Sequence, residues 1–308
     1  ISLSDHFGGA PFFYVATVRN RDNVLLSETI YQNPFAGEDA MMKRYCCLFA
    51  FIVCFVPTSV FGLDPDRKLN QHTLEVYTTE AGLPQSSVVS IIQTADGYLW
   101  MGTFEGIARF DGRRFTIFDK TNVPELENNS IKSLFQSTEG CLWAATPNGL
   151  LCMKNGKFVK YTTANGLASN FILSLTEDSD GHLWVGTTHG LSRFDGDAFQ
   201  SFSEADGLID EYVAALSPAP DNGVWVGTAE GLDLFRDGTF THYGKADGLP
   251  GLDIRCLYTD TDGSLWIGTG GDGLAHYQDS TFQVYNKKQG LMTPDVRAIV
   301  RDRNGTLW

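Results

Sequence analysis

The stretch GHLWVGTTHGLSRFDGDAF, from Gly181 to Phe199, decides the fold because it recurs along the chain. Its tryptophan has a counterpart in the same frame of every repeat, and successive tryptophans lie 43, 41, 41, 41 and 42 residues apart. A period of this size with strand-like content is typical of solenoids and propellers. The tryptophans of the chain are Trp100, Trp143, Trp184, Trp225, Trp266 and Trp308.

Each repeat predicts four short antiparallel strands. In the quoted repeat and its flanks, strands are expected over 172–177, 182–187, 190–194 and 199–202. Between them lie turn residues such as Asp180-Gly181 and Asp195-Gly196, which tolerate the backbone of a tight hairpin. Four short strands covered on both faces are typical of a propeller blade. The sequence therefore predicts an all-β fold, a β-propeller with five full blades and a partial sixth.

The repeated tryptophans favour a structural role over a binding role. One large ring per blade fills the wedge between neighbouring sheets. The alternative is a ring of aromatic platforms on which sugars stack. The neighbouring glycine and leucine repeat as faithfully as the ring itself, which favours packing. We therefore predict a structural role for Trp100, Trp143, Trp184, Trp225 and Trp266.

The blades are expected at regular positions between a repeated linker signature. The linkers have the pattern xxGLP, as in EAGLP at 80–84 and ADGLP at 246–250. Leu74–Thr78 matches the outermost strand of later blades and is expected to lie beside the incomplete sixth blade or to stay unpaired. The blades are expected at about 87–118, 130–161, 170–202, 211–243 and 253–285, with a sixth from Val296 that breaks off at Trp308 in a longer parent.

The first 62 residues contain a pattern that predicts export. Met41–Gly62 combines a basic start, an apolar core of about a dozen residues and a small-residue end, as secretory signal peptides do. An uncleaved signal anchor is the alternative. Residues 1–40 are interpreted as an upstream extension that is not native or is disordered, and residues 63–308 as the propeller. The protein is therefore expected in the periplasm.

Composition and motifs exclude several kinds of chemistry. The formal net charge of −14 argues against nucleic acid as a partner. Asp178-Ser179-Asp180-Gly181 resembles the start of a calcium loop but lacks the distal glutamate, so a turn is expected and no metal or other cofactor. Cys141, Cys152 and Cys256 are expected to be small buried hydrophobes, with no disulfide among them.

The repeats resemble the two-component regulator propeller family. The motifs that carry the resemblance are the xxGLP linker, DGxLWxGT and GLxRFDG, over about residues 63–308. Blade two departs from the pattern, with Ala144-Ala145-Thr146 and Met153-Lys154-Asn155. The resemblance implies a periplasmic sensor domain. Its parent would be anchored by a later membrane span, able to form a homodimer, and would end in a cytoplasmic histidine kinase or diguanylate cyclase.

The candidate site lies in the connections between the second and third strands of each blade. These connections vary while the flanking GT and GL repeat, as expected where a frame holds the fold and loops hold specificity. Polar groups with one aromatic ring suit a small polar ligand, an oligosaccharide by family resemblance. Solvated turns without a ligand are the alternative. The candidate ligand-binding residues are Phe104, Glu105, His189, Glu230 and Asp272.

Three functional classes stay open on these observations. A ligand-sensing input domain without catalytic residues of its own is the leading hypothesis. A secreted propeller hydrolase or lyase acting on carbohydrate is the first alternative. A passive protein-interaction propeller is the second.

Overall fold

The computed structural model describes residues 15–20, 23–26, 75–302 and 305–308. The chain divides into two compact units, residues 1–78 and residues 79–308. The first contains β1 (Val15–Asn20), β2 (Asn23–Leu26) and β3 (Glu75–Tyr77), in the sheet order β2-β1-β3. The signal peptide predicted at 41–62 lies outside the described residues. The interpretation of residues 1–40 as an upstream extension and of 41–62 as a signal peptide therefore stays a prediction.

One of the two expectations for Leu74–Thr78, that the strand stays unpaired, is wrong. Val76 and Tyr77 of β3 pair antiparallel with Ala16 and Val15 of β1. The pairing partner lies about sixty residues earlier in the chain and is not part of a repeat. Comparing the repeats with one another therefore could not predict this pairing.

The second unit is built from five four-stranded antiparallel sheets, each in simple sequential order. Blade one comprises β4 (Val88–Gln93), β5 (Leu99–Thr103), β6 (Gly106–Phe110) and β7 (Phe115–Phe118). Blade two comprises β8 (Ser133–Gln136), β9 (Leu142–Thr146), β10 (Gly149–Lys154) and β11 (Lys157–Tyr161). Blade three comprises β12 (Ile172–Glu177), β13 (Leu183–Thr187), β14 (Gly190–Phe194) and β15 (Phe199–Phe202).

The last two sheets repeat this arrangement. Blade four comprises β16 (Val213–Ala219), β17 (Gly223–Thr228), β18 (Leu232–Arg236) and β19 (Thr239–Tyr243). Blade five comprises β20 (Ile254–Thr259), β21 (Leu265–Thr269), β22 (Leu274–Gln278) and β23 (Thr281–Tyr285). After β23, isolated bridges join Gly270 to Asp295 and Arg301 to Leu307.

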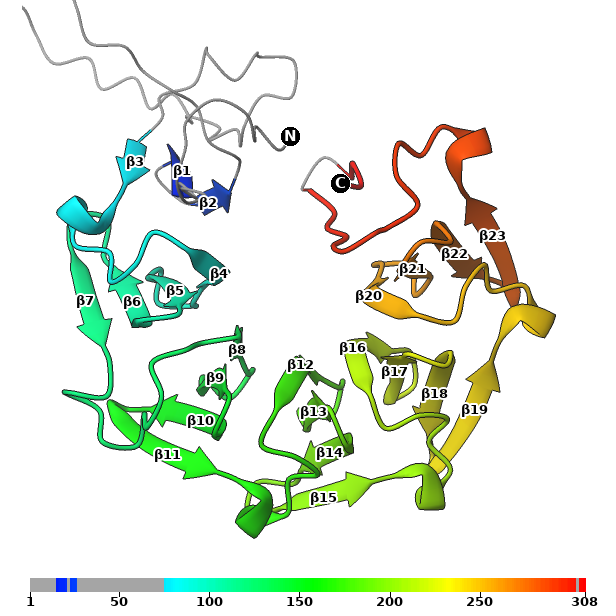
Figure 1. The fold of residues 1–308 in the computed structure, drawn as a ribbon, viewed down its shortest axis with the longest axis horizontal. Coiled ribbons are helices and arrows are strands. Elements are labelled where there is room, and N and C mark those ends of the chain that lie inside the picture. Colours follow the sequence, from blue (N-terminus) through cyan, green and yellow to red (C-terminus); the bar gives the residue numbers. More distant parts are fainter. Residues whose placement is uncertain (1–14, 21–22, 27–74, 303–304) are drawn as a thin grey trace, which may run out of the picture. The chain divides into compact units, whose positions relative to one another are not determined.

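The blades follow one another around an arc, with their first strands on the inside and their last strands on the outside (Figure 1). Successive inner strands are in contact: β4 with β8, β8 with β12, β12 with β16, and β16 with β20. This arrangement confirms the predicted all-β propeller fold. Among the described residues, helical structure is limited to short 3-10 turns, and no helix has the length and apolarity needed to cross a membrane.

The 3-10 turns occupy the linkers between blades. They are η2 (Thr79–Ala81), η3 (Thr163–Asn165), η4 (Glu204–Asp206), η5 (Lys245–Asp247) and η6 (Lys287–Gln289). The glycine of the xxGLP signature ends each turn in the left-handed region, as at Gly166 with φ 92°. The following leucine is buried in the first four of these turns, as at Leu167, and half-buried at Leu291.

The core lies between the blades. Trp184 on β13 is 1% exposed and packs against Phe202 of its own blade and Phe235 of blade four, with ring centroids 5.9 and 5.0 Å apart. Gly186, two residues later, lets blade four approach, because a Cβ there would lie 2.6 Å from Cγ1 of Val213. Aromatic rings therefore fill the wide part of the wedge between two blades. Gly186 lets β13 lie close to β16, the inner strand of the next blade.

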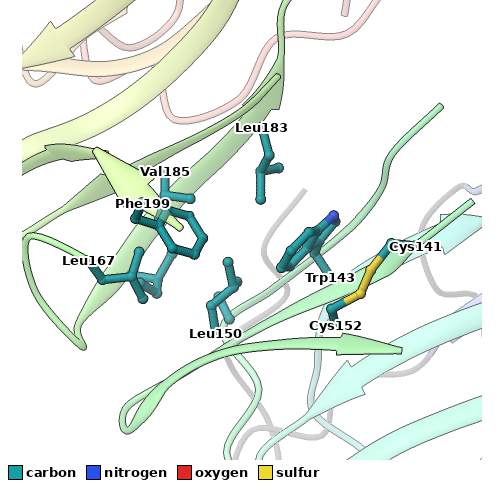
Figure 2. Packing of buried hydrophobic residues seen from close by; sticks show 10 residues of the cluster. Cys141, Trp143, Leu150, Cys152, Leu167, Leu183, Val185 and Phe199 are labelled. Carbon is teal, nitrogen blue, oxygen red and sulfur yellow. A yellow bond between two sulfur atoms is a disulfide. The ribbon is translucent and has the colours of Figure 1, made fainter. Parts of the chain in front are cut away.

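The cysteine prediction is wrong in part. Cys141 and Cys152 form a disulfide, with Cα atoms 5.9 Å apart, within the usual range for a disulfide. Antiparallel pairing of β9 with β10 brings the two residues together beside Trp143 (Figure 2). Both are buried, as expected, in the core between blades two and three. Cys256 is a free cysteine.

Candidate functional site

The linkers and the turns between second and third strands share one face of the blades, which we call the loop face. Hydrogen bonds join the two sets of loops directly. The Phe104 amide donates to Oε1 of Gln85 at 3.2 Å, and the Gly190 amide donates to the Glu211 carbonyl at 2.7 Å. The Ala229 amide donates to Oδ1 of Asp210 at 3.4 Å. The loops therefore form a continuous surface from blade to blade.

A buried threonine at the end of each second strand shapes every turn on this face. The hydroxyl of Thr187 donates to the Gly190 carbonyl at 2.8 Å and accepts from the His189 amide at 3.1 Å. Thr103, Thr146, Thr228 and Thr269 make the same type of pair of hydrogen bonds. The threonine satisfies the turn internally, so the side chains at its tip are free to differ between blades.

The structure places all five predicted site residues on the loop face, where their side chains are exposed. Phe104 and Glu105 lie between β5 and β6, His189 between β13 and β14, Glu230 between β17 and β18, and Asp272 between β21 and β22. They are spread over blades one, three, four and five. The geometry therefore brings them onto one surface without joining them in a single cavity.

Two of these residues interact with neighbouring loops. The Phe104 ring lies 5.2 Å from Nζ of Lys132, a cation–π contact between blade one and the linker to blade two. Nδ2 of Asn129 in the same linker donates to Oε2 of Glu105 at 3.4 Å. Nδ1 of His189 lies 2.9 Å from Oγ1 of Thr188. The Phe104 ring, the Glu105 carboxylate and the His189 imidazole are thus held at the surface and are not buried.

Two exposed aromatic residues on this face were missed from the sequence. Phe171 is 58% exposed and Tyr212 is 42% exposed, and each immediately precedes the inner strand of its blade, β12 or β16. These two inner strands are neighbours in the arc. The signal was available, since the two rings occupy the same position of the linker signature, counted from Gly166 and Gly207.

The equivalent position in the last linkers carries an ion pair instead of a ring. Asp253 accepts from Nη2 of Arg255 at 2.6 Å, and Asp295 accepts from Nε of Arg297 at 2.9 Å. The loop face therefore changes from aromatic at blades three and four to charged beyond them. Rings offer stacking surfaces, and the paired groups offer hydrogen bonds.

A separate hollow of about 630 Å³ lies between blades one and two. The linker 119–132 beside it lacks the 3-10 turn found in the other linkers. Elsewhere the linker glycine covers a phenylalanine of the next outer strand, as at Gly248, where a Cβ would lie 3.4 Å from Phe282. The equivalent Phe158 instead lines the hollow, with Ile117, Val123, Glu125 and Lys157 among the other lining residues.

Metal binding has little support in the described part of the chain. No group of three or more His, Cys, Asp or Glu side chains is placed there to hold an ion. The calcium-like turn serves the backbone, because Oδ1 of Asp178 accepts from the amides of Asp180 and His182 at 3.1 and 2.9 Å.

The fold places residues 79–308 among the β-propellers. Three segments match the family model described as two component regulator propeller: residues 82–105, 166–189 and 248–271. Each segment runs from the linker glycine through the first two strands to the turn of the loop face. The chain therefore carries repeats of the two component regulator propeller family. No match was found among curated proteins.

Solved structures share the fold at low sequence identity. The extracellular domain assigned to a hybrid two component system of B. thetaiotaomicron is 22% identical, with a TM-score of 0.48, over 74% of this chain and 38% of that one. Virginiamycin B lyase from Staphylococcus aureus is 17% identical, with a TM-score of 0.55, over 72% and 76%. PorZ of Porphyromonas gingivalis is 13% identical, with a TM-score of 0.55, over 72% and 37%.

The two likenesses with TM-scores of 0.55, to the lyase and to PorZ, indicate a shared propeller fold. Propellers of this kind occur in a lyase as well as in a secretion-system component, so the fold alone does not select a function. The chain spans 38% of the length of the B. thetaiotaomicron domain.

Proposed function

We propose that residues 79–308 belong to an extracytoplasmic input domain of a two-component signalling protein, which binds a small polar ligand on the loop face. The observation that carries the proposal is the content of the family-matched segments. Each contains a linker and a turn, the two elements that build the loop face. Within that frame the turn threonine recurs and the tip residues differ, an arrangement suited to ligand specificity.

The chemistry of the loop face favours an uncharged, hydroxyl-rich ring compound, and we propose an oligosaccharide. Phe171 and Tyr212 offer flat apolar surfaces on neighbouring blades. Glu105, His189 and Glu230 offer hydrogen-bonding groups on the same face, on blades one, three and four. A sugar ring has one apolar face and a polar edge, which this mixture matches.

Two independent features support a location outside the cytoplasm. The Met41–Gly62 pattern predicts export. The Cys141–Cys152 disulfide suits an oxidising compartment such as the periplasm. The proposed parent is membrane-anchored and homodimeric, and passes the signal to a cytoplasmic histidine kinase or diguanylate cyclase.

Calorimetry on the whole exported chain tests the binding proposal. The probes are a panel of neutral linear and branched oligosaccharides and, in parallel, their uronate and sulfate counterparts. We expect a neutral compound to bind, and Glu105→Ala, His189→Ala and Glu230→Ala to weaken it by about two- to tenfold each through loss of one hydrogen bond. The melting temperature should stay unchanged because these side chains are exposed.

Asp197→Ala is the matched control, since this exposed carboxylate lies in the turn between β14 and β15, away from the linkers. Its affinity should equal that of the unmodified chain. Unchanged affinity in all three loop-face variants would move the site elsewhere. Hydrolysis or elimination of a bound oligosaccharide would favour the enzymatic alternative over sensing.

A further inference from the structure

A buried carboxylate in blade four holds the linker that brings Tyr212 to the loop face. Asp233 on β18 is 0% exposed. Its Oδ2 accepts a hydrogen bond from the Ile209 amide of the linker at 2.8 Å, and its Oδ1 lies 2.6 Å from Nδ1 of His242 on β19. Both oxygens of Asp233 are therefore occupied by donors, one from a side chain and one from the linker backbone.

Blade three makes the same link without titratable groups. The hydroxyl of Ser192 accepts from the Ala168 amide at 2.9 Å and lies 2.9 Å from the hydroxyl of Ser201. Ser192 and Ser201 pair across β14 and β15 as Asp233 and His242 pair across β18 and β19. The chain thus contains a neutral and a titratable version of one linker anchor.

The anchored segment continues directly into the loop face. Oδ1 of Asp210 accepts from the Tyr212 amide at 3.1 Å and from the Ala229 amide at 3.4 Å. The Glu211 carbonyl accepts from the Gly190 amide at 2.7 Å. Movement of Ile209 would therefore be passed to Tyr212 and to the turns that carry His189 and Glu230.

Protonation of Asp233 creates a conflict between hydrogen atoms. When solvent supplies a proton to one carboxyl oxygen, that oxygen becomes a donor and faces another donor. A proton on Oδ2 competes with the hydrogen of the Ile209 amide, and a proton on Oδ1 changes the contact with Nδ1 of His242. A neutral carboxyl group also accepts hydrogen bonds less strongly than a carboxylate does. The anchor is therefore weaker in the protonated form.

Burial lets Asp233 take up this proton at a higher pH than an exposed aspartate would. It raises the pKa of Asp233 above its ordinary value of 3.8, against the hydrogen bonds from His242 and the Ile209 amide, which lower it. Other charged groups on the surrounding elements have partners or solvent exposure. The two arginines have acceptors: Arg193 of blade three donates to Gln200, and Arg236 donates to the Pro220 carbonyl. Two carboxylates of the linker have donors: Asp206 accepts from Ser203, and Asp210 accepts from backbone amides. Glu204 is exposed and Glu211 is half-buried.

We propose that Asp233 and His242 are positioning residues that hold the linker 203–212 and loosen it when Asp233 takes up a proton. The consequence for ligand binding rests on the proposed function: affinity falls in acid at Tyr212 and at the turns that carry His189 and Glu230, which are joined to the anchored linker by hydrogen bonds.

Amide NMR of the whole 308-residue chain tests the anchor without any ligand. We expect the Ile209 amide signal to shift sigmoidally as pH is lowered, with a midpoint above 3.8, while the equivalent Ala168 amide does not follow it. The double variant Asp233→Ser/His242→Ser copies blade three and should abolish the Ile209 titration. Asp233→Asn keeps the side-chain volume, so it should also abolish the titration if the double variant folds poorly.

A flat Ile209 signal in the unmodified chain, or a titration that persists in the variants, would overturn the proposal. If an oligosaccharide from the panel binds, its affinity should fall through the same pH range in the unmodified chain and not in the double variant. A chain that binds none of the probes contradicts the proposed function, while the amide titration still decides the anchor.

Discussion

The indole nitrogen of Trp184 donates a 2.7 Å hydrogen bond to Oδ2 of Asp178, the residue six positions earlier. Trp100 makes the same type of bond to Thr94, and Trp308 makes it to Asp302. In blade four the position is Ala219, and the buried indole nitrogen of Trp225 has no partner. The buried indole nitrogens of Trp143 and Trp266 have no partner either, although Ser137 and Asp260 occupy the same position. The indole hydrogen bond is therefore a feature of individual blades and not of every repeat.

Asp178→Ala should destabilise the protein by about 1–3 kcal/mol, because it leaves a buried indole N–H without an acceptor. The variant also removes the acceptor of the Asp180 and His182 amides. Urea unfolding measures the change. Asp180→Ala, an exposed position in the same turn, should have little effect; an equal loss in both variants would contradict the role of the indole bond.

Gly186→Ala should cost about 1–3 kcal/mol, because the new methyl group would overlap Val213 of the next inner strand. Gly244→Ala is the matched control. Its φ of −134° suits alanine, and a Cβ there would lie 4.0 Å from Cδ2 of Leu252, so a change within about 0.5 kcal/mol is expected. Thermal unfolding of both variants checks the prediction. Equal melting temperatures would show that the blades can separate to accept the methyl group.

Removing the disulfide by Cys141→Ala/Cys152→Ala should cost about 2–4 kcal/mol. Peptide mapping without reduction should recover the two residues in one linked peptide pair. Cys256 should react slowly with iodoacetamide in the folded protein, because burial raises its pKa to about 11 and little thiolate forms. Rapid native labelling of Cys256, or unlinked Cys141 in exported protein, would contradict this prediction.

Phe171→Ala and Tyr212→Ala should each weaken oligosaccharide binding several-fold through loss of about 1 kcal/mol of stacking. Stability should hardly change because both rings are largely exposed. Val159→Ala, an exposed apolar residue on the outer strand β11, is the control and should bind normally. Titration calorimetry and melting curves separate the two effects. Full affinity in both ring variants would leave the hydrogen-bonding groups as the sole recognition elements.

The pH dependence of stability should reveal Asp233. Because its pKa is raised in the folded chain, the fold binds this proton more tightly than the unfolded chain does between 3.8 and the raised value. Its contribution to stability therefore increases as pH falls through that window and decreases as pH rises. Relief of the buried charge outweighs the weakening of the two hydrogen bonds to Asp233.

Comparison with Asp233→Asn isolates this contribution from surface carboxylates such as Asp111 and Asp195, whose pKa values are lowered by backbone hydrogen bonds and act in the opposite sense. The difference in unfolding free energy between the two proteins should grow in favour of the unmodified chain from about pH 7 to about pH 4. A difference that does not vary with pH would show that Asp233 has an ordinary pKa.

Local signals in the sequence were sufficient to predict the strands of the blades. Alternation of apolar residues, Asp-Gly turns and the tryptophan period specify strands such as 172–177 and 190–194, because hairpin strands pair with their neighbours in the chain. The same logic placed Phe104, Glu105, His189, Glu230 and Asp272 on one face. Alternating strand direction returns every second connection to the same side, whatever residues it contains.

Contacts between different strands and loops required the tertiary structure. Cys141 meets Cys152 because of the register between β9 and β10, and β3 pairs with β1, far away in sequence. The Asp233–His242 anchor likewise exists only once β18, β19 and a linker from outside the blade come together. Composition and repeat period do not predict such contacts. A shift of one residue in strand register decides whether two side chains share a face of a sheet or lie on opposite faces.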